Sequence, residues 1–205
     1  MDIRVILAPT LELAQTVPAT ATVEAEYGDT VVTGTKVTLA HHSGEYANNP
    51  APCTIDVKPL EKGSTILVSH INPDTVGACL ALMGRKPESK QFWQAVGFID
   101  VTGPHNMHKL SSTQQDMLNA LWAWSNSAFP KTRCSEITDV TAQILKYVSI
   151  IERIIKGDEE LINAGRIWKN KTAEAVESCL VTEFHHVRVF RTTNVFALQV
   201  ITLLL

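Results

Sequence analysis

The stretch TILVSHINPDTVGACLALMG, residues 65–84, constrains the fold more than any other part of the chain. Its first half is an apolar, β-branched run of the kind that forms a buried strand. Asn72 suits a helix N-cap, Pro73 suits the first helical position, and the carboxylate of Asp74 in the first turn interacts favourably with the helix dipole. Gly84 closes the apolar run that follows, as glycine does at helix C-termini. The stretch therefore predicts a strand followed directly by a helix.

The rest of the chain extends this pattern into an α/β fold. Residues 1–60 are strand-like over IRVILA, TVEAEYG and TVVTGTKVTLA, with turns between them. We expect a helix over Glu88–Ala95 and a short strand over Val96–Val101. Later helices are expected over STQQDMLNALWAWSNSA, capped by Ser112 or Thr113, over SEITDVTAQILKYVSIIERIIKG, and over DEELINAGRIWKNKTAEAVESCL. We predict a mostly parallel sheet flanked by helices, with a helical layer added by the second half.

The composition is that of an ordinary globular protein, with 45% hydrophobic and 19% charged residues among 205. We expect a single α/β domain over residues 1–205, with a strand-rich part over 1–60. The apolar ending NVFALQVITLLL is either a buried final strand or a sign that a C-terminal part, 183–205, is truncated. It is too short to span a bilayer, and it offers a surface for a homodimer.

Charge and cysteine usage argue against several classes of partner. The net charge is -3 and the basic residues are scattered, so we expect no nucleic acid. The N-terminus lacks a signal-peptide pattern, and we expect no membrane partner. The 4 cysteines lie far apart without a C-x-x-C pair, which favours a reducing cytoplasm over a disulfide framework. A cytoplasmic protein that acts on a small molecule fits these features.

Histidines and carboxylates gather where three predicted strands end, after KVTLA, STILVS and VGFI. The members of this set are His41, His42, His70, Asp74, Asp100, His105 and His108. Ligands of open α/β sheets bind beyond the carboxyl ends of the strands, so we expect these side chains to share one edge of the sheet. Imidazole with carboxylate, and no thiolate, is the ligand set of hydrolytic Zn²⁺, Mn²⁺ or Fe²⁺ sites. The pattern predicts a metal site whose ion lowers the pKa of water to roughly 7.

Each member of this set also has an ordinary structural interpretation. Asp74 alone is a helix-start carboxylate, and Asp100 with Gly103-Pro104 forms a turn. His41 and His42 alone are half-buried residues at a strand end, and the later histidines lie on a loop. Their gathering at predicted strand ends favours a shared metal site instead.

The segment SHINPDTVGACLALMG resembles the first motif of the DHH phosphoesterase superfamily, which is named for its Asp-His-His signature. His70 and Asp74 match ligand positions of that family, and Gly77-Ala78 match the small pair that lets the helix approach the sheet. Asp100 looks like the isolated aspartate of the second motif. GPHNMH is similar to the histidine-bearing third motif, with His105 at the ligand position.

The chain departs from the family pattern in two places. Val76 stands where the first motif usually carries a second aspartate, and no Asp-His-His triplet is present. The double histidine His41-His42 follows Ala40 and precedes the first motif. We therefore expect a single-metal or altered site in which His41 and His42 supply replacement ligands.

The resemblance implies a hydrolase that uses a divalent metal, most often Mn²⁺, with Zn²⁺ or Fe²⁺ as alternatives, on a small phosphorylated substrate. The expected metal ligands are His70, Asp74, Asp100, His41 and His105. The expected catalytic groups, which stabilise phosphoryl charge or protonate the leaving oxygen, are His42, His105 and His108. Two alternatives stay open: a metal- or ligand-binding module that has lost catalysis, and a metal-dependent hydrolase of a non-phosphate bond.

Overall fold

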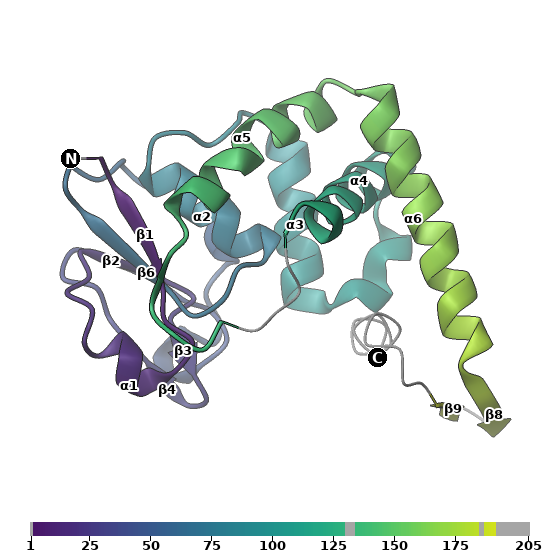
Figure 1. The fold of residues 1–205 in the computed structure, drawn as a ribbon, viewed down its shortest axis with the longest axis horizontal. Helices are drawn as coiled ribbons and strands as arrows, with labels where there is room; N and C mark the ends of the chain where they lie inside the picture. The colour runs from purple at the N-terminus through teal and green to yellow at the C-terminus, as the bar shows by residue number, and fades with distance from the viewer. Residues whose placement is uncertain (1, 130–133, 185–186, 192–205) are drawn as a thin grey trace. The chain divides into compact units, whose positions relative to one another are not determined.

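The computed structural model describes residues 2–129, 134–184 and 187–191, over which strands and helices alternate (Figure 1). The strands are β1 (Arg4–Leu7), β2 (Ala21–Val23), β3 (Glu26–Tyr27), β4 (Thr30–Val31), β5 (Val37–Leu39), β6 (Thr65–Val68), β7 (Thr138–Asp139), β8 (Leu180–Phe184) and β9 (Val187–Phe190). The α-helices are α1 (Leu11–Ala14), α2 (Pro73–Leu82), α3 (Lys90–Thr102), α4 (Ser112–Ala128), α5 (Thr141–Ile155) and α6 (Glu159–Ser178). Short 3-10 helices are η1 (Gly44–Tyr46), η2 (Pro52–Thr54) and η3 (Pro104–Lys109).

The chain splits into two compact units. Unit 1 comprises Met1–Asp100 with Lys131–Glu152, and unit 2 comprises Val101–Pro130 with Arg153–Leu205. Unit 1 contains the larger sheet and the α2 helix, whereas unit 2 contains α4, α6 and the β8–β9 pair. The single α/β domain over residues 1–205 stays a prediction.

The sheet of unit 1 has the strand order β5-β2-β6-β1-β7. Its first four strands pair in parallel, and only the short edge strand β7 runs antiparallel to its neighbour. Its central strands are apolar because both faces of a parallel sheet are covered. Leu67 of β6, for example, packs against Ala8, Ala14 and Ala25. The predicted α/β class with a mostly parallel sheet is confirmed.

The step from β6 into α2 forms as its sequence predicts. The Asn72 side chain accepts a hydrogen bond from the backbone N–H of Thr75, and Pro73 occupies the first turn. α2 ends at Leu82, and Gly84 follows with φ +65°, a left-handed conformation that glycine adopts without strain. The strand end and the helix N-terminus are therefore joined by only a few residues, and the side chains on both lie close together.

The prediction of a strand over Val96–Val101 is wrong, because α3 continues as a helix to Thr102. α3 packs against η2 at Gly97, where an added Cβ would lie 2.6 Å from Thr54 Cγ2. Gly77 of α2 likewise faces Cys53 and the Trp93 ring, so this glycine admits neighbouring side chains at close range. Asp100 consequently projects from the last turns of a helix and not from the end of a strand.

Two boundaries in the second half also differ from the prediction. Ser111, one residue earlier than expected, caps α4 through a reciprocal pair of hydrogen bonds with Gln114. α5 begins only at Thr141, because Thr138–Asp139 pair with β1 as β7. Gly157 follows α5 with φ +77°, as expected for a helix end.

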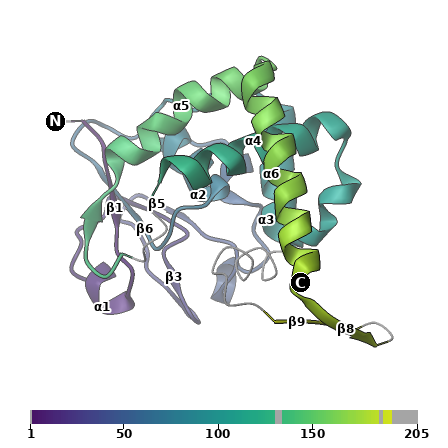
Figure 2. The same ribbon diagram turned by 45° about the vertical axis from the view of Figure 1, so that its right-hand side comes forward.

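In unit 2, α4 and α6 lie side by side (Figure 2). Gly165 of α6 permits this approach, since an added Cβ would lie 2.4 Å from the backbone nitrogen of Ala120. β8 and β9 pair antiparallel beyond α6. The sequence pattern predicts His185 and His186 to be an exposed loop pair, but these residues and the apolar ending 192–205 lie outside the described residues. Within the described ranges no helix combines the length and the apolar character needed to cross a membrane.

Candidate metal centre

Polar side chains gather at the carboxyl ends of three neighbouring parallel strands in unit 1. His41 and His42 come after β5, Glu24 comes directly after β2, and Ser69-His70 come after β6. The shared direction of these strands places their carboxyl ends at one edge of the sheet. Ligands of open α/β sheets bind at this edge, and two of the three predicted strand ends do meet there.

Glu24 is the residue of this edge that the sequence pattern did not reveal. Its side chain is fully buried, and its backbone has φ +46°, an uncommon conformation for a residue with a Cβ. Because β2 ends at Val23, the chain turns at Glu24 while its N–H still bonds to the carbonyl of Leu39. The sequence suggested a strand that continued through TVEAEYG, which hid a strand-end carboxylate.

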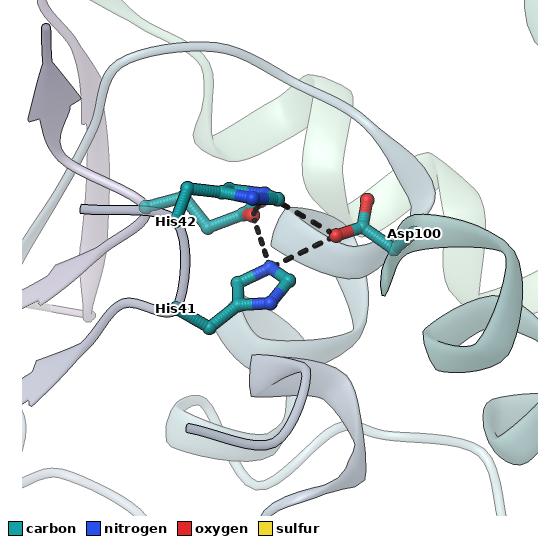
Figure 3. A group of neighbouring side chains, drawn as sticks. His41, His42 and Asp100 are labelled. Atoms are coloured by element: carbon teal, nitrogen blue, oxygen red, sulfur yellow. Dashed lines mark hydrogen bonds and ion pairs between the residues drawn. The ribbon is translucent and has the colours of Figure 1, made fainter. Parts of the chain in front are cut away.

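Four side chains from separate segments form one group: Glu24, His41, His42 and Asp100. One nitrogen or oxygen atom from each lies within 4.8 Å of the other three. His41 Nε2 lies 3.1 Å from Glu24 Oε1 and 2.9 Å from Asp100 Oδ2. His42 Nε2 lies 3.3 Å and 3.5 Å from the same two oxygens. Figure 3 shows the His41 and His42 rings directed at the carboxylate of Asp100.

The four nitrogen-to-oxygen separations match those between neighbouring ligands of a single ion. Bonds of about 2.1 Å that diverge by roughly 90–109° place neighbouring ligand atoms about 3.0–3.4 Å apart. The four nitrogen-to-oxygen distances in the group run from 2.9 to 3.5 Å. A single ring N–H can bond well to only one acceptor, yet His41 Nε2 faces three carboxylates, including Asp74 Oδ2 at 3.8 Å. The Glu/His/His/Asp group could therefore bind a metal ion.

Two buried carboxylate oxygens lack a hydrogen bond within the described part of the chain. Asp74 Oδ1 accepts the backbone N–H of Cys53 at 2.8 Å, but Asp74 Oδ2 has no such donor. Asp100 Oδ1 accepts from the side-chain amide of Asn72 at 3.0 Å, whereas Asp100 Oδ2 has no donor other than its ion-pair partners His41 and His42. A buried carboxylate oxygen without a donor is costly, and a cation satisfies it. Both oxygens face His41 Nε2.

The charges of the group shift its pKa values in opposite directions. Burial alone would lower the pKa of His41, but the facing carboxylates of Asp100 and Glu24 raise it to about 10. Burial raises the pKa of Asp74 to about 7, and the negative charge of Glu24 adds to this rise. Burial would also raise the pKa of Glu24, but contacts with His41 and His42 outweigh it and hold the pKa far below its usual value. A proton on His41 thus balances the carboxylates when no metal is bound.

His42 and His70 form the accessible side of the centre, with about half of each side chain exposed at 47%. Contact with Glu24 raises the pKa of His42. His70 Nε2 lies 3.5 Å from Glu24 Oε2, and His70 Nδ1 lies 2.9 Å from Ser69 Oγ. Because the Ser69 hydroxyl donates to the carbonyl of Glu24, its oxygen accepts from Nδ1–H, which leaves Nε2 as the acceptor nitrogen. This nitrogen faces the Glu24 carboxylate from the accessible side of the centre.

His105 and His108, expected at the same centre, lie on η3 in unit 2. His105 Nε2 contacts the side-chain amide of Asn106 at 2.9 Å, and His108 Nδ1 contacts the carbonyl of His105 at 2.9 Å. Both side chains are exposed. Their part in the site stays a prediction, whereas His41, His42, Asp74 and Asp100 are brought together in unit 1.

Comparison with protein-family models, with curated proteins and with solved structures finds no match for this chain. The resemblance to the DHH superfamily therefore stays a hypothesis that depends on the residues of the first motif.

Proposed function

We propose that the chain is a metal-dependent hydrolase of the phosphoesterase type, which uses a divalent metal, Mn²⁺ above all, to activate water. One observation carries this proposal: imidazole nitrogens and carboxylate oxygens that follow β2 and β5 or project from α3 lie within 4.8 Å of one another. A donor set of nitrogen and oxygen without sulfur suits Mn²⁺, Zn²⁺ and Fe²⁺. The resemblance of SHINPDTVGA to the first DHH motif favours Mn²⁺ and a phosphoester.

Four residues would hold the ion, namely Glu24, His41, His42 and Asp100. The metal supplies a Lewis acid that lowers the pKa of water towards neutrality. His41 would have to release its Nε2 proton to bind the ion, because only a deprotonated ring nitrogen can act as a metal ligand. Asp74 lies outside this group of four, but its Oδ1 is held by the Cys53 N–H and its Oδ2 lies 3.8 Å from His41 Nε2, so it would be a fifth ligand if it moved towards the ion.

We assign proton transfer to the half-exposed imidazole of His70. His70 presents an acceptor nitrogen towards Glu24 while Ser69 fixes its other nitrogen, so it can take a proton at Nε2. His42 shares this exposure and was expected as a catalytic group, but as a ligand its Nε2 would be occupied by the ion.

A metal titration tests the proposal most directly. Protein purified without chelator should contain Mn, Fe or Zn by elemental analysis, and the chelated protein should bind Mn²⁺ by isothermal titration calorimetry. Asp100→Asn keeps the shape and the bond to Asn72 but loses the charge, so it should bind Mn²⁺ at least about 10-fold more weakly. A panel of phosphomonoesters and phosphodiesters should be hydrolysed by the wild type and not by this variant. Protein free of metal that also gains none on titration would end the proposal.

A binding module that has lost catalysis is the second candidate, favoured by Val76. This side chain is fully buried where the DHH motif usually carries a carboxylate, so one ligand of a two-metal site is missing. A chain that binds Mn²⁺ but hydrolyses no phosphoester would support this reading. Carboxylic esters and amides in the same panel test the remaining alternative, hydrolysis of a non-phosphate bond.

A further inference from the structure

The first turn of α2 contacts the candidate metal centre from outside. We call Asn72–Thr75 the α2 turn; it lies entirely within unit 1. Two of its side chains, Asn72 and Thr75, contact carboxylates of the centre and provide no atom to the group of four. The two carboxylates, Glu24 and Asp100, come from different elements.

Asn72 makes two hydrogen bonds that fix the orientation of its amide. Its Oδ1 accepts the backbone N–H of Thr75 at 2.7 Å, and its Nδ2 donates to Asp100 Oδ1 at 3.0 Å. The helix N–H requires the oxygen on that side, so the amide nitrogen must face Asp100. One carboxylate oxygen of Asp100 is thereby occupied, and the other, Oδ2, is left towards His41 and His42.

Thr75 likewise occupies one carboxylate oxygen of Glu24 and leaves the other towards the histidines. Its hydroxyl donates to Glu24 Oε2 at 2.5 Å, and both side chains are fully buried. Glu24 Oε1 is then the oxygen that faces His41 Nε2 and His42 Nε2. The two bonds from the α2 turn thus select which oxygen of each carboxylate is presented to the centre.

We propose that Asn72 and Thr75 are positioning residues that orient Asp100 and Glu24 for metal binding. This inference depends on the proposed metal site, since it concerns the affinity of that site. Because hydrogen bonds to metal-binding carboxylates fix their direction, their loss typically costs about 10–100-fold in affinity. Within the N-P-D-T sequence, Pro73 starts the helix, while Asn72 and Thr75 hold two carboxylates from other segments of the chain.

Matched substitutions separate positioning from helix capping. Asn72→Ser keeps a good N-cap but loses the amide that reaches Asp100. Asn72→Asp also keeps the N-cap but places a second carboxylate next to that of Asp100, so its loss of Mn²⁺ affinity should be larger than that of Asn72→Ser. Thr75→Val keeps the shape and loses the hydroxyl, and Thr75→Ser restores it. Each variant is titrated with Mn²⁺ by calorimetry, and its thermal unfolding is followed in chelator.

We expect Asn72→Ser and Thr75→Val to bind Mn²⁺ about 10–100-fold more weakly than the wild type, and Thr75→Ser to bind within about 3-fold of it. A merely structural role predicts a lower unfolding temperature in chelator with unchanged affinity at 25 °C, and that result would overturn the inference. Wild-type protein that binds no Mn²⁺ would instead refute the proposed function itself. The two failures are therefore distinguishable.

Discussion

Two pairs of histidines look alike in the sequence and lie in opposite environments in the structure. His41 and His42 contact the carboxylates of Glu24 and Asp100, and the side chain of His41 is only 2% exposed. His105 and His108 are exposed on η3, and their described contacts are with Asn106 and with the backbone of the same helical turn.

The difference shows that spacing in the chain is a poor guide to chemistry. The pair at the end of β5 gains its properties from a glutamate on the neighbouring strand and an aspartate on α3, both distant in sequence. The pair on η3 is surrounded by its own segment. Carboxylates and burial, more than the presence of imidazole, distinguish a candidate metal centre from surface histidines.

Loss of His41 should have the largest effect, because it removes the group that faces three carboxylates. In His41→Ala, Mn²⁺ affinity should fall by more than about 100-fold, beyond the cost of losing an outer hydrogen bond. The metal-free protein should lose about 3–5 kcal/mol of stability at pH 7, since buried carboxylates are left without a partner. Calorimetry and urea unfolding measure the two effects.

His42→Ala is the companion variant in case His41→Ala does not fold. The His42 side chain is half exposed, so its loss should weaken Mn²⁺ binding by at least about 10-fold while stability changes by under about 1 kcal/mol. Unchanged affinity in both variants would show that His41 and His42 take no part in metal binding.

The pH dependence of stability should report on the buried side chains of Asp74 and His41. In chelator, the folded protein keeps a proton on Asp74 up to about pH 7 and on His41 up to about pH 10, whereas the unfolded chain releases them near 3.8 and 6.5. The folded state therefore holds more protons, and stability should fall as the pH rises from about 5 to 9. The lowered pKa of Glu24 acts only below its usual 4.5 and does not reverse this trend.

Mn²⁺ should oppose this trend, because it competes with protons for the same atoms. The gain in unfolding temperature on adding Mn²⁺ should therefore widen from pH 5 to pH 8, and at 100 times Kd it corresponds to about 2.7 kcal/mol. Asp74→Asn mimics the protonated carboxyl of Asp74. In chelator, the stability of this variant should therefore depend less on pH between about pH 5 and 7 than that of the wild type. A gain that stays constant with pH would mean that the ion binds elsewhere.

The fold was predictable where the deciding signals are local. The strand into α2, with Asn72 as cap and Pro73 in the first turn, depends on residues within one short stretch. The strand prediction for Val96–Val101 was wrong because this segment is apolar and β-branched like a strand. Its helical state depends on the packing of Gly97 against η2, which no local sequence pattern reveals. Tertiary contacts overrode propensity there.

The candidate centre was predictable only in part, for the same reason. His41, His42, Asp74 and Asp100 were expected together, although Asp100 arrives from a helix and not from a strand end. Glu24 was missed because its importance follows from strand order: β2 lies between β5 and β6, which the sequence does not reveal. A glutamate just before a turn was the available signal, and it is too common to be specific.

Replacing the two histidines of η3 should have the smallest effect. In the double variant His105→Ala, His108→Ala, stability should change by under about 0.5 kcal/mol, as expected of exposed side chains outside a packed core. If His41 and His42 are the histidines that bind metal, the Mn²⁺ stoichiometry and affinity of this variant should equal those of the wild type. If His105 is a ligand, as the resemblance of GPHNMH to the third DHH motif implies, affinity should fall by about 10-fold or more at unchanged stability. The second result would bring η3 into the site and end the contrast between the two pairs, so this variant decides whether unit 1 alone forms the centre.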